Sequence, residues 1–199
     1  MIDYNRNIIF IHIPKCGGTS VENALFTDEE KTERNLFTLK GHPKHDLYEQ
    51  GGLQHLSAKK VKEITTDEVY NNCYKFSVVR NPIDRLISQY NYTNQFIDFY
   101  SYLNLKPNNF SFSEYLNAIS NKYHVHWRPQ HEFIYNDKQE LLVDEVFKLE
   151  NIKNGKLEEK IGAKLPHHNK SYKHIESITE KDESIIKNIF SKDFELLQY

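Results

Sequence analysis

The chain has 199 residues, which is enough for one compact domain with a hydrophobic core, and we expect a single domain over residues 1–199. Hydrophobic residues make up 38% and charged residues 27%, as in an ordinary globular protein, and a formal net charge of −2 excludes a globally basic surface for nucleic acid. No stretch approaches the roughly 20 apolar residues of a membrane span, and no signal-peptide pattern follows residues 1–6, so we expect a cytoplasmic protein without an integral membrane segment.

The first predicted element is a strand over residues 8–13, in an isoleucine-rich run that ends at Pro14. Two glycines, Gly17 and Gly18, follow as a tight turn, and a helix is expected over about residues 19–26. Backbone N–H groups at a helix start have no partner within the helix, so they attract an anion. This strand, turn and helix therefore predict an anion-binding loop, whereas an ordinary glycine turn is the alternative.

Side chains in the same loop fit a phosphate-like ligand. Lys15 adds a positive charge, and Thr19 and Ser20 add hydroxyl donors. Cys16 also lies in the loop, where a catalytic thiol is an alternative role, although no nucleophile signature surrounds it. Cys73 is expected to pack beside a strand, and two cysteines do not make a disulfide framework.

The next segment is predicted to be irregular over residues 37–52 and contains His42 and His45. Loops of this length are often functional. A short helix is expected over residues 56–64, with Ser57 as its N-cap.

A second strand is predicted over residues 74–79 from its β-branched and aromatic residues. It ends at Arg80, and Pro82 is suited to the first turn of a new helix. On that helix Ser88 lies partly off the apolar stripe, and Arg85 is expected to pair with nearby acids.

Later segments repeat the alternation of helix and strand. The patterns predict an irregular region at 94–110, a helix at 111–119, a strand at 141–149, and helices at 151–161 and 179–190. Strands that alternate with helices predict an α/β fold, with a central, mostly parallel sheet flanked by helices in three layers.

The first loop departs from the Walker phosphate-binding motif, in which a lysine directly follows the last glycine. Here Thr19 follows Gly18, and the lysine lies upstream at position 15. The second strand ends in Arg80, where a metal-binding carboxylate would be expected. The histidines show no paired metal-ligand spacing. These features favour an anion site made of cations and hydroxyls, without a metal.

Two motifs resemble those of sulfotransferases that use 3′-phosphoadenosine-5′-phosphosulfate (PAPS). Residues 10–20 are similar to the family's 5′-phosphosulfate loop, with Cys16 where Thr or another small residue is usual, and residues 76–90 resemble its 3′-phosphate motif. Further similarity to the carbohydrate branch of the family lies in residues 54–59, 126–130, 143–151, 168–171 and 192–194.

The resemblance implies a P-loop-like fold, PAPS as the donor and no metal. It implies His55 as the general base, with His42 and His45 as alternatives, and Lys15 as the group that stabilises the leaving phosphate. The implied donor-binding residues are Lys15, Cys16, Gly17, Gly18, Thr19, Ser20, Arg80, Ser88, Asn169 and Ser171.

The resemblance also implies a carbohydrate hydroxyl as acceptor, with residues 36–54 and 92–110 as walls of its site. His12 is interpreted as a core histidine, and His126 and Trp127 as packing residues, with Trp127 as an alternative acceptor wall. Two other functions remain open at this stage: a kinase-like phosphotransferase, which would need Mg²⁺, and a catalytically silent nucleotide-binding protein.

Overall fold

The computed structural model describes residues 1–37, 52–107, 109–166 and 178–199. Within these residues one sheet has the strand order β1 (Ile2–Asp3), β2 (Ile8–Ile11), β3 (Tyr74–Val79) and β4 (Glu145–Lys148). β1 is antiparallel to β2, whereas β2, β3 and β4 are mutually parallel. The structure therefore confirms the predicted α/β fold with a mostly parallel sheet.

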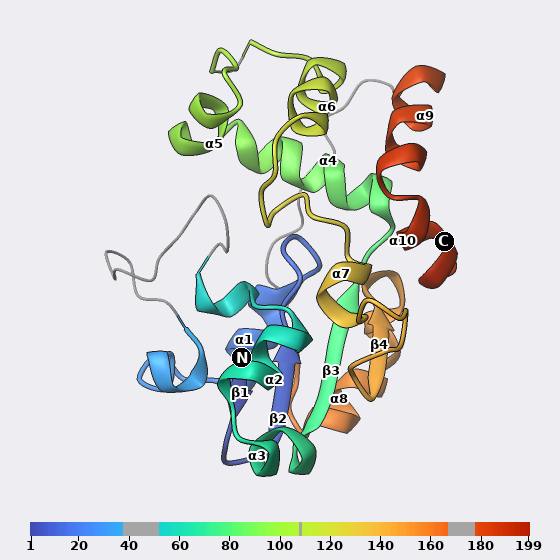
Figure 1. The fold of residues 1–199 in the computed structure, drawn as a ribbon. Coiled ribbons are helices and arrows are strands. Elements are labelled where there is room, and N and C mark those ends of the chain that lie inside the picture. Colours follow the sequence, from blue (N-terminus) through green and yellow to red (C-terminus); the bar gives the residue numbers. More distant parts are fainter. Residues whose placement is uncertain (38–51, 108, 167–177) are drawn as a thin grey trace.

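Helices surround the sheet and extend beyond the carboxyl ends of its strands (Figure 1). The α-helices are α1 (Gly18–Leu25), α2 (Ala58–Ile64), α3 (Asp67–Asn72), α4 (Pro82–Thr93), α5 (Ile97–Tyr102), α6 (Phe112–Ser120), α7 (His131–Ile134), α8 (Lys156–Ile161), α9 (Glu180–Ile189) and α10 (Ser191–Leu196). Short 3₁₀ helices are η1 (Glu33–Asn35), η2 (Leu53–His55) and η3 (Leu149–Asn154).

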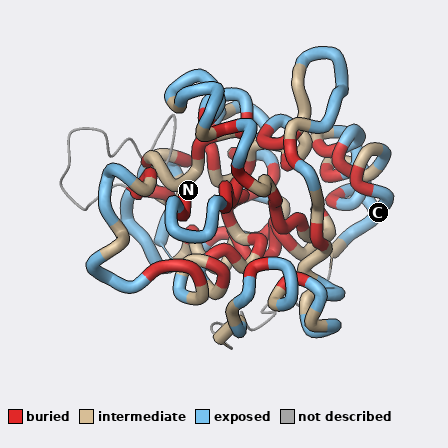
Figure 2. Tube along the Cα trace, turned by 90° about the horizontal axis from the view of Figure 1, so that it is seen from below, coloured by how far each residue is buried: buried red, intermediate tan, exposed pale blue. Residues whose placement is uncertain are grey.

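The sheet is covered on both faces because alternate residues of a strand point to opposite sides. Ile8 and Phe10 of β2 pack into a core with α1 and α8, whereas Ile9 and Ile11 pack into a second core with α2, α3 and α7. Buried residues fill the interior of the molecule, and exposed residues lie on the peripheral turns and helix faces (Figure 2). Both faces being buried explains why β2 is an uninterrupted apolar run.

A third core lies beyond the carboxyl ends of the strands, between α4, α5, α6 and α9 (Figure 1). Leu86 of α4, Tyr115 and Leu116 of α6, and Ile186 of α9 are each at most 1% exposed. These contacts anchor α4, which starts at Pro82, shortly after the end of β3 at Val79.

Several predicted elements agree closely with the structure. The strand at 74–79 has the predicted bounds, and Pro82 opens α4. The Ser57 side chain accepts a hydrogen bond from the Lys60 N–H at 3.3 Å, so it caps α2 as expected. In the described residues no helix is long and apolar enough to cross a membrane.

Other boundaries were wrong. Residues 97–102, predicted to be irregular, form α5, because Phe99 is buried in the third core and its packing outweighs weak helix propensity. The strand predicted at 141–149 shrinks to β4, and the helix predicted at 151–161 divides at Gly155, whose φ of 80° is left-handed. The short elements β1, α3 and α10 had no prediction.

Candidate active site

A pocket of about 760 Å³ lies at the carboxyl ends of β2 and β3, where ligands bind in open parallel sheets. Its walls come from the β2–α1 loop, α4 and the chain between η3 and Pro166. The lining residues are His12, Pro14, Lys15, Gly17, Gly18, Thr19, Ser20, His55, Arg80, Ser88, Tyr92, His126, Leu149, Ile152, Lys153, Glu158, Lys164, Leu165 and Pro166.

The β2–α1 loop is tightly shaped by its two glycines. Gly17 has a φ of 80°, and a Cβ there would lie 2.7 Å from Cδ1 of Leu149. A Cβ on Gly18 would lie 1.8 Å from Nε2 of His12, which leaves no room for a side chain. Helix α1 begins at Gly18, so its free N–H groups lie at the pocket.

His12 fixes the inner side of this loop. Its ring stacks on Phe10, with centroids 5.5 Å apart, and its Nδ1 lies 2.8 Å from Oε1 of Glu22. Burial raises the pKa of Glu22, but the charge and the hydrogen bond of His12 together lower it by more. The net pKa of Glu22 is therefore below its ordinary value. His12 is buried as expected, and it also reaches the pocket.

Lys15 is the cation of the first loop. Its backbone is left-handed, with a φ of 67°, and its Nζ lies 3.9 Å from the centre of the Tyr92 ring. Burial, followed by the nearby charge of Arg80, lowers the pKa of Lys15 to about 8. A ligand with negative charge would relieve this repulsion between the two cations.

Arg80 and Ser88 lie in the same pocket as the first loop. The Arg80 guanidinium Nη1 donates to the carbonyl of Lys15 at 3.4 Å. The side chain of Asn81 caps α4 by accepting from the N–H groups of Ile83 and Asp84. The β3–α4 turn therefore directs a second cation, Arg80, to the mouth of the first loop.

His55 is held with a defined tautomer. Its Nδ1 lies 3.1 Å from the backbone carbonyl of His12. A carbonyl oxygen only accepts, so Nδ1 carries the proton and Nε2 keeps a lone pair. Burial, followed by the neighbouring His12, lowers the pKa of His55 well below its ordinary value. The ring is therefore neutral and able to accept a proton.

His126 is a pocket residue that the sequence interpretation assigned to packing. Its ring centroid lies 5.5 Å from that of His55, and its Nδ1 lies 3.0 Å from Oε1 of Gln89, a fully buried residue. Burial, followed by His55, lowers the pKa of His126 well below its ordinary value. The sequence signal was its place at the start of the 126–130 motif. Trp127 is buried as expected, with its Nε1 donating to the Lys122 carbonyl.

Cys16 does not line the pocket. Its side chain turns into the interior, where Sγ donates to Oε1 of Gln130 at 3.3 Å. Burial raises the pKa of the Cys16 thiol to about 12, so it is not a thiolate at neutral pH. Cys16 as a donor-binding residue therefore stays a prediction, which its side chain does not support, and the raised pKa does not support a catalytic thiol.

Arg85 also differs from expectation, because no acid among the described residues pairs with it. The residue is 1% exposed, and its guanidinium donates to the carbonyls of Pro14, Arg128 and His126, at 3.0, 2.8 and 3.1 Å. These bonds tie α4 to the β2–α1 loop and to the chain before α7.

Four predicted site residues, His42, His45, Asn169 and Ser171, lie outside the described residues. Among the residues that the structure does describe, there is no group of three or more His, Cys, Asp or Glu side chains that could hold a metal ion. Independence from metal stays a prediction.

The fold and the pocket define a class: an α/β protein whose pocket brings a strand–turn–helix loop with Lys15 together with a neighbouring strand end that carries Arg80. Comparison with protein families then places the chain. It belongs to the sulfotransferase family, whose model matches residues 1–199, and this membership implies an enzyme that uses PAPS as sulfuryl donor. Comparisons with curated proteins and with solved structures gave no match.

Proposed function

We propose that this sulfotransferase transfers the sulfuryl group of PAPS to a hydroxyl of a carbohydrate, with His55 as general base. The observation that carries the proposal is the meeting of two separate anion-binding loops and a neutral histidine in one pocket. Bound PAPS supplies the sulfuryl group and leaves as 3′-phosphoadenosine-5′-phosphate (PAP).

The residues present fit a nucleotide with two separated anionic groups. Free N–H groups at the start of α1, with the hydroxyls of Thr19 and Ser20, would hold the 5′ end. Arg80 and Ser88 would hold the 3′-phosphate, because they lie at the β3 end and on α4 of the same pocket. Asn169 and Ser171 are proposed as further contacts from the resemblance alone.

Proton transfer falls to His55. The bond to His12 leaves Nε2 of His55 with a lone pair, so it can take the hydroxyl proton while the acceptor oxygen bonds to sulfur. The bond from sulfur to the phosphate oxygen breaks at the same centre, and the Lys15 ammonium stabilises the charge that develops on that oxygen. No proton is needed from Cys16.

A carbohydrate acceptor is supported by the side chains near His55. Tyr92 and His126 line the pocket beside it, and Phe96, which is 42% exposed, packs on Tyr92 with centroids 4.3 Å apart. Aromatic faces with polar neighbours suit the apolar and hydroxyl surfaces of a sugar ring.

Calorimetry with PAP and with ATP, each with and without Mg²⁺, tests the donor. We expect tighter binding of PAP and no dependence on Mg²⁺. Tighter binding of ATP, or a need for Mg²⁺, would contradict the proposal and favour a kinase-like phosphotransferase.

His55→Ala tests the base. Since His55 is proposed to act on the acceptor, this variant should bind PAP normally and lose about 100- to 10,000-fold in turnover with a carbohydrate acceptor. His126→Ala is the matched variant, because both histidines are neutral and line the pocket, and it should lose less. Normal turnover in His55→Ala, with a large loss in His126→Ala, would transfer the role of base to His126.

A further inference from the structure

Gln130 joins the two anion-binding loops through one side-chain amide. Its Oε1 accepts from the Arg80 N–H at 2.9 Å and from the Cys16 thiol at 3.3 Å, while its Nε2 donates to the Arg80 carbonyl at 2.8 Å. Gln130 is fully buried, so water does not compete for these bonds. Both backbone polar groups of Arg80 are therefore fixed by a residue 50 positions away.

The Arg80 backbone needs such a partner because β3 ends at Val79. Beyond the strand, the sheet no longer supplies hydrogen bonds to N–H and carbonyl groups. The amide of Gln130 supplies the hydrogen bonds that a neighbouring strand would otherwise make with Arg80. It thereby sets the direction in which the Arg80 side chain leaves the backbone.

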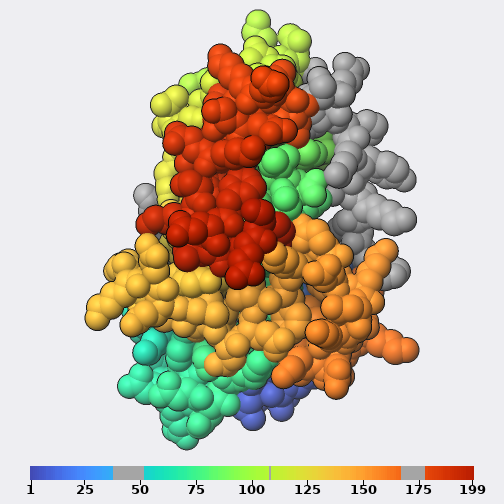
Figure 3. All heavy atoms as spheres, turned by 90° about the vertical axis from the view of Figure 1, so that its right-hand side faces the viewer, coloured from blue at the N-terminus to red at the C-terminus, as the bar shows by residue number. Residues whose placement is uncertain are grey.

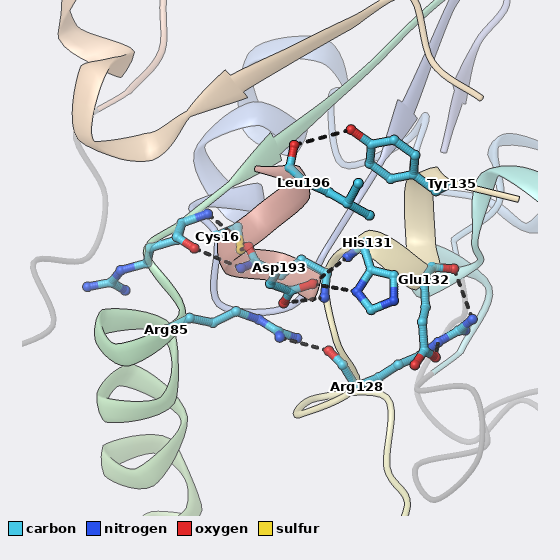
Figure 4. Close-up of polar contacts among 10 residues, drawn as sticks. Cys16, Arg85, Arg128, His131, Glu132, Tyr135, Asp193 and Leu196 are labelled. Atoms are coloured by element: carbon cyan, nitrogen blue, oxygen red, sulfur yellow. Dashed lines mark hydrogen bonds and ion pairs between the residues drawn. The ribbon is translucent and has the colours of Figure 1, made fainter. Parts of the chain in front are cut away.

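Asp193 of α10 fixes the backbone of Gln130 and of the next residue, His131, by hydrogen bonds. Its Oδ2 accepts from the Gln130 N–H at 2.7 Å, and its Oδ1 accepts from the His131 N–H and Nδ1 at 2.8 and 2.7 Å. Asp193 is fully buried. Figure 4 shows Asp193 and His131 joined by these bonds beside Cys16, and Figure 3 shows the C-terminal helices (red) seated against the yellow and orange segments that include α7.

Arg85 fixes the same segment from the other side. It bonds the Pro14 carbonyl in the first loop together with the Arg128 and His126 carbonyls, as Figure 4 shows for Arg128. The chain before α7 is thus bonded to both loops and to α10, and its position sets how far apart the loops lie.

We infer that Gln130, held by Asp193, is a positioning residue that aligns Arg80 with the first loop and so gives the pocket its preference for a nucleotide with a 3′-phosphate. The inference rests on the proposed function. A displacement of about 1 Å in a binding group is enough to cost up to about 100-fold in a catalysed reaction, so loss of these bonds has a measurable effect even though neither residue is assigned a contact with the nucleotide.

The test compares PAP with adenosine 5′-phosphate (5′-AMP), which lacks the 3′-phosphate. The ratio of their Kd values, measured by calorimetry, isolates the contribution of the 3′-phosphate contacts, which we assign to Arg80 and Ser88. Gln130→Met removes the amide with little change in length, and Asp193→Asn replaces with an NH2 group one of the two carboxylate oxygens that accept from Gln130 and His131. Asp182→Asn is the control, because Asp182 is 2% exposed and its carboxylate accepts bonds from Ser113 and Thr179, neither of which belongs to either loop.

We expect Gln130→Met to lower the preference for PAP about tenfold and Asp193→Asn to lower it several-fold, each with the Kd of 5′-AMP changed less than threefold. Asp182→Asn should lower the melting temperature and leave the preference unchanged, which separates positioning from stability. If Gln130→Met shows no cooperative unfolding transition, Asp193→Asn decides alone.

A wild-type preference that both variants retain would overturn the inference while leaving the proposed function intact. A wild-type protein that binds 5′-AMP as tightly as PAP would instead refute the proposed function.

Discussion

The two anion-binding loops are built by different parts of the chain. The β2–α1 loop is shaped locally, by the left-handed backbone of Lys15 and Gly17 and by the lack of a side chain on Gly18. The β3–α4 turn is shaped from a distance, because its Arg80 backbone is bonded by Gln130, which is held in turn by Asp193. The conformation of the β2–α1 loop is set mainly by its own residues, whereas that of the β3–α4 turn is set mainly by residues distant in the sequence.

The difference teaches where each loop is vulnerable. Substitutions within the first loop should distort it directly, whereas the second loop should lose affinity through its own ligand-binding side chains and, to a smaller extent, through changes in its distant partners. Four measurements test this comparison, in order of decreasing effect.

Gly18→Ala should have the largest effect. The new Cβ would lie 1.8 Å from Nε2 of His12, which is held by Glu22 and cannot move away freely. We expect PAP binding to fall more than 1000-fold and the free energy of unfolding to fall by about 3 kcal/mol, measured by calorimetry and urea titration. Gly162→Ala is the control for crowding, because no atom of the described residues lies within 4 Å of its Cβ position, and its left-handed φ of 65° costs about 1 kcal/mol without a clash. Equal effects from both would show that crowding by His12 is unimportant.

Arg80→Ala comes next. Removal of a charged donor to the 3′-phosphate should weaken PAP binding about 100-fold, while the Kd of 5′-AMP stays within threefold of wild type. Arg34→Ala removes a guanidinium that packs over Tyr4, remote from the pocket, and should change neither Kd. Equal losses for PAP and 5′-AMP in Arg80→Ala would place this residue at the 5′ end.

The pH dependence of PAP binding should show the charge of Lys15. With a pKa of about 8, Lys15 is protonated at pH 7 and largely neutral at pH 9.5, so the ligand anion loses a cation as pH rises. We expect the Kd of PAP to increase about tenfold across this range. Lys15→Met should bind weakly at pH 7 and show a flat profile, and a slope that survives in this variant would mean that another group titrates.

Ser88→Ala should have the smallest effect. Loss of one hydroxyl donor on α4 is expected to weaken PAP binding about fivefold, with 5′-AMP unaffected. Ser120→Ala, which removes a hydroxyl bonded to the Leu116 carbonyl on α6, serves as the control. A loss of PAP affinity in Ser88→Ala as large as that in Arg80→Ala would contradict the expectation that the Arg80 charge contributes more to binding.

The sequence was informative wherever structure follows from neighbouring residues. The run at 74–79 and the Ser57 cap were predicted well because period, propensity and capping act over a few positions. The β2–α1 loop was found for the same reason, since its glycines adjoin the strand and helix that define it.

The remainder depends on contacts between distant residues. Arg85 was expected to pair with an acid, but the fold brings the backbone carbonyls of Pro14 and Arg128 to it instead. His126 was interpreted as a packing residue because no neighbouring residue in the sequence indicates its hydrogen bond to Gln89, which orients the His126 ring at the pocket. The sequence could not show that the Cys16 thiol bonds to Gln130, because Gln130 lies 114 positions later.

The position of Asp193 has a consequence for how the donor pocket forms during folding. The bond between Asp193 and Gln130 spans 63 residues, and that between Gln130 and Cys16 spans 114, so the nucleotide pocket is closed by contacts of high sequence separation. Such contacts require long loops to close and form slowly compared with single helices. During synthesis the glycine loop can be complete while the pocket is not, and full affinity for the donor should arise only once α10 has left the ribosome and docked.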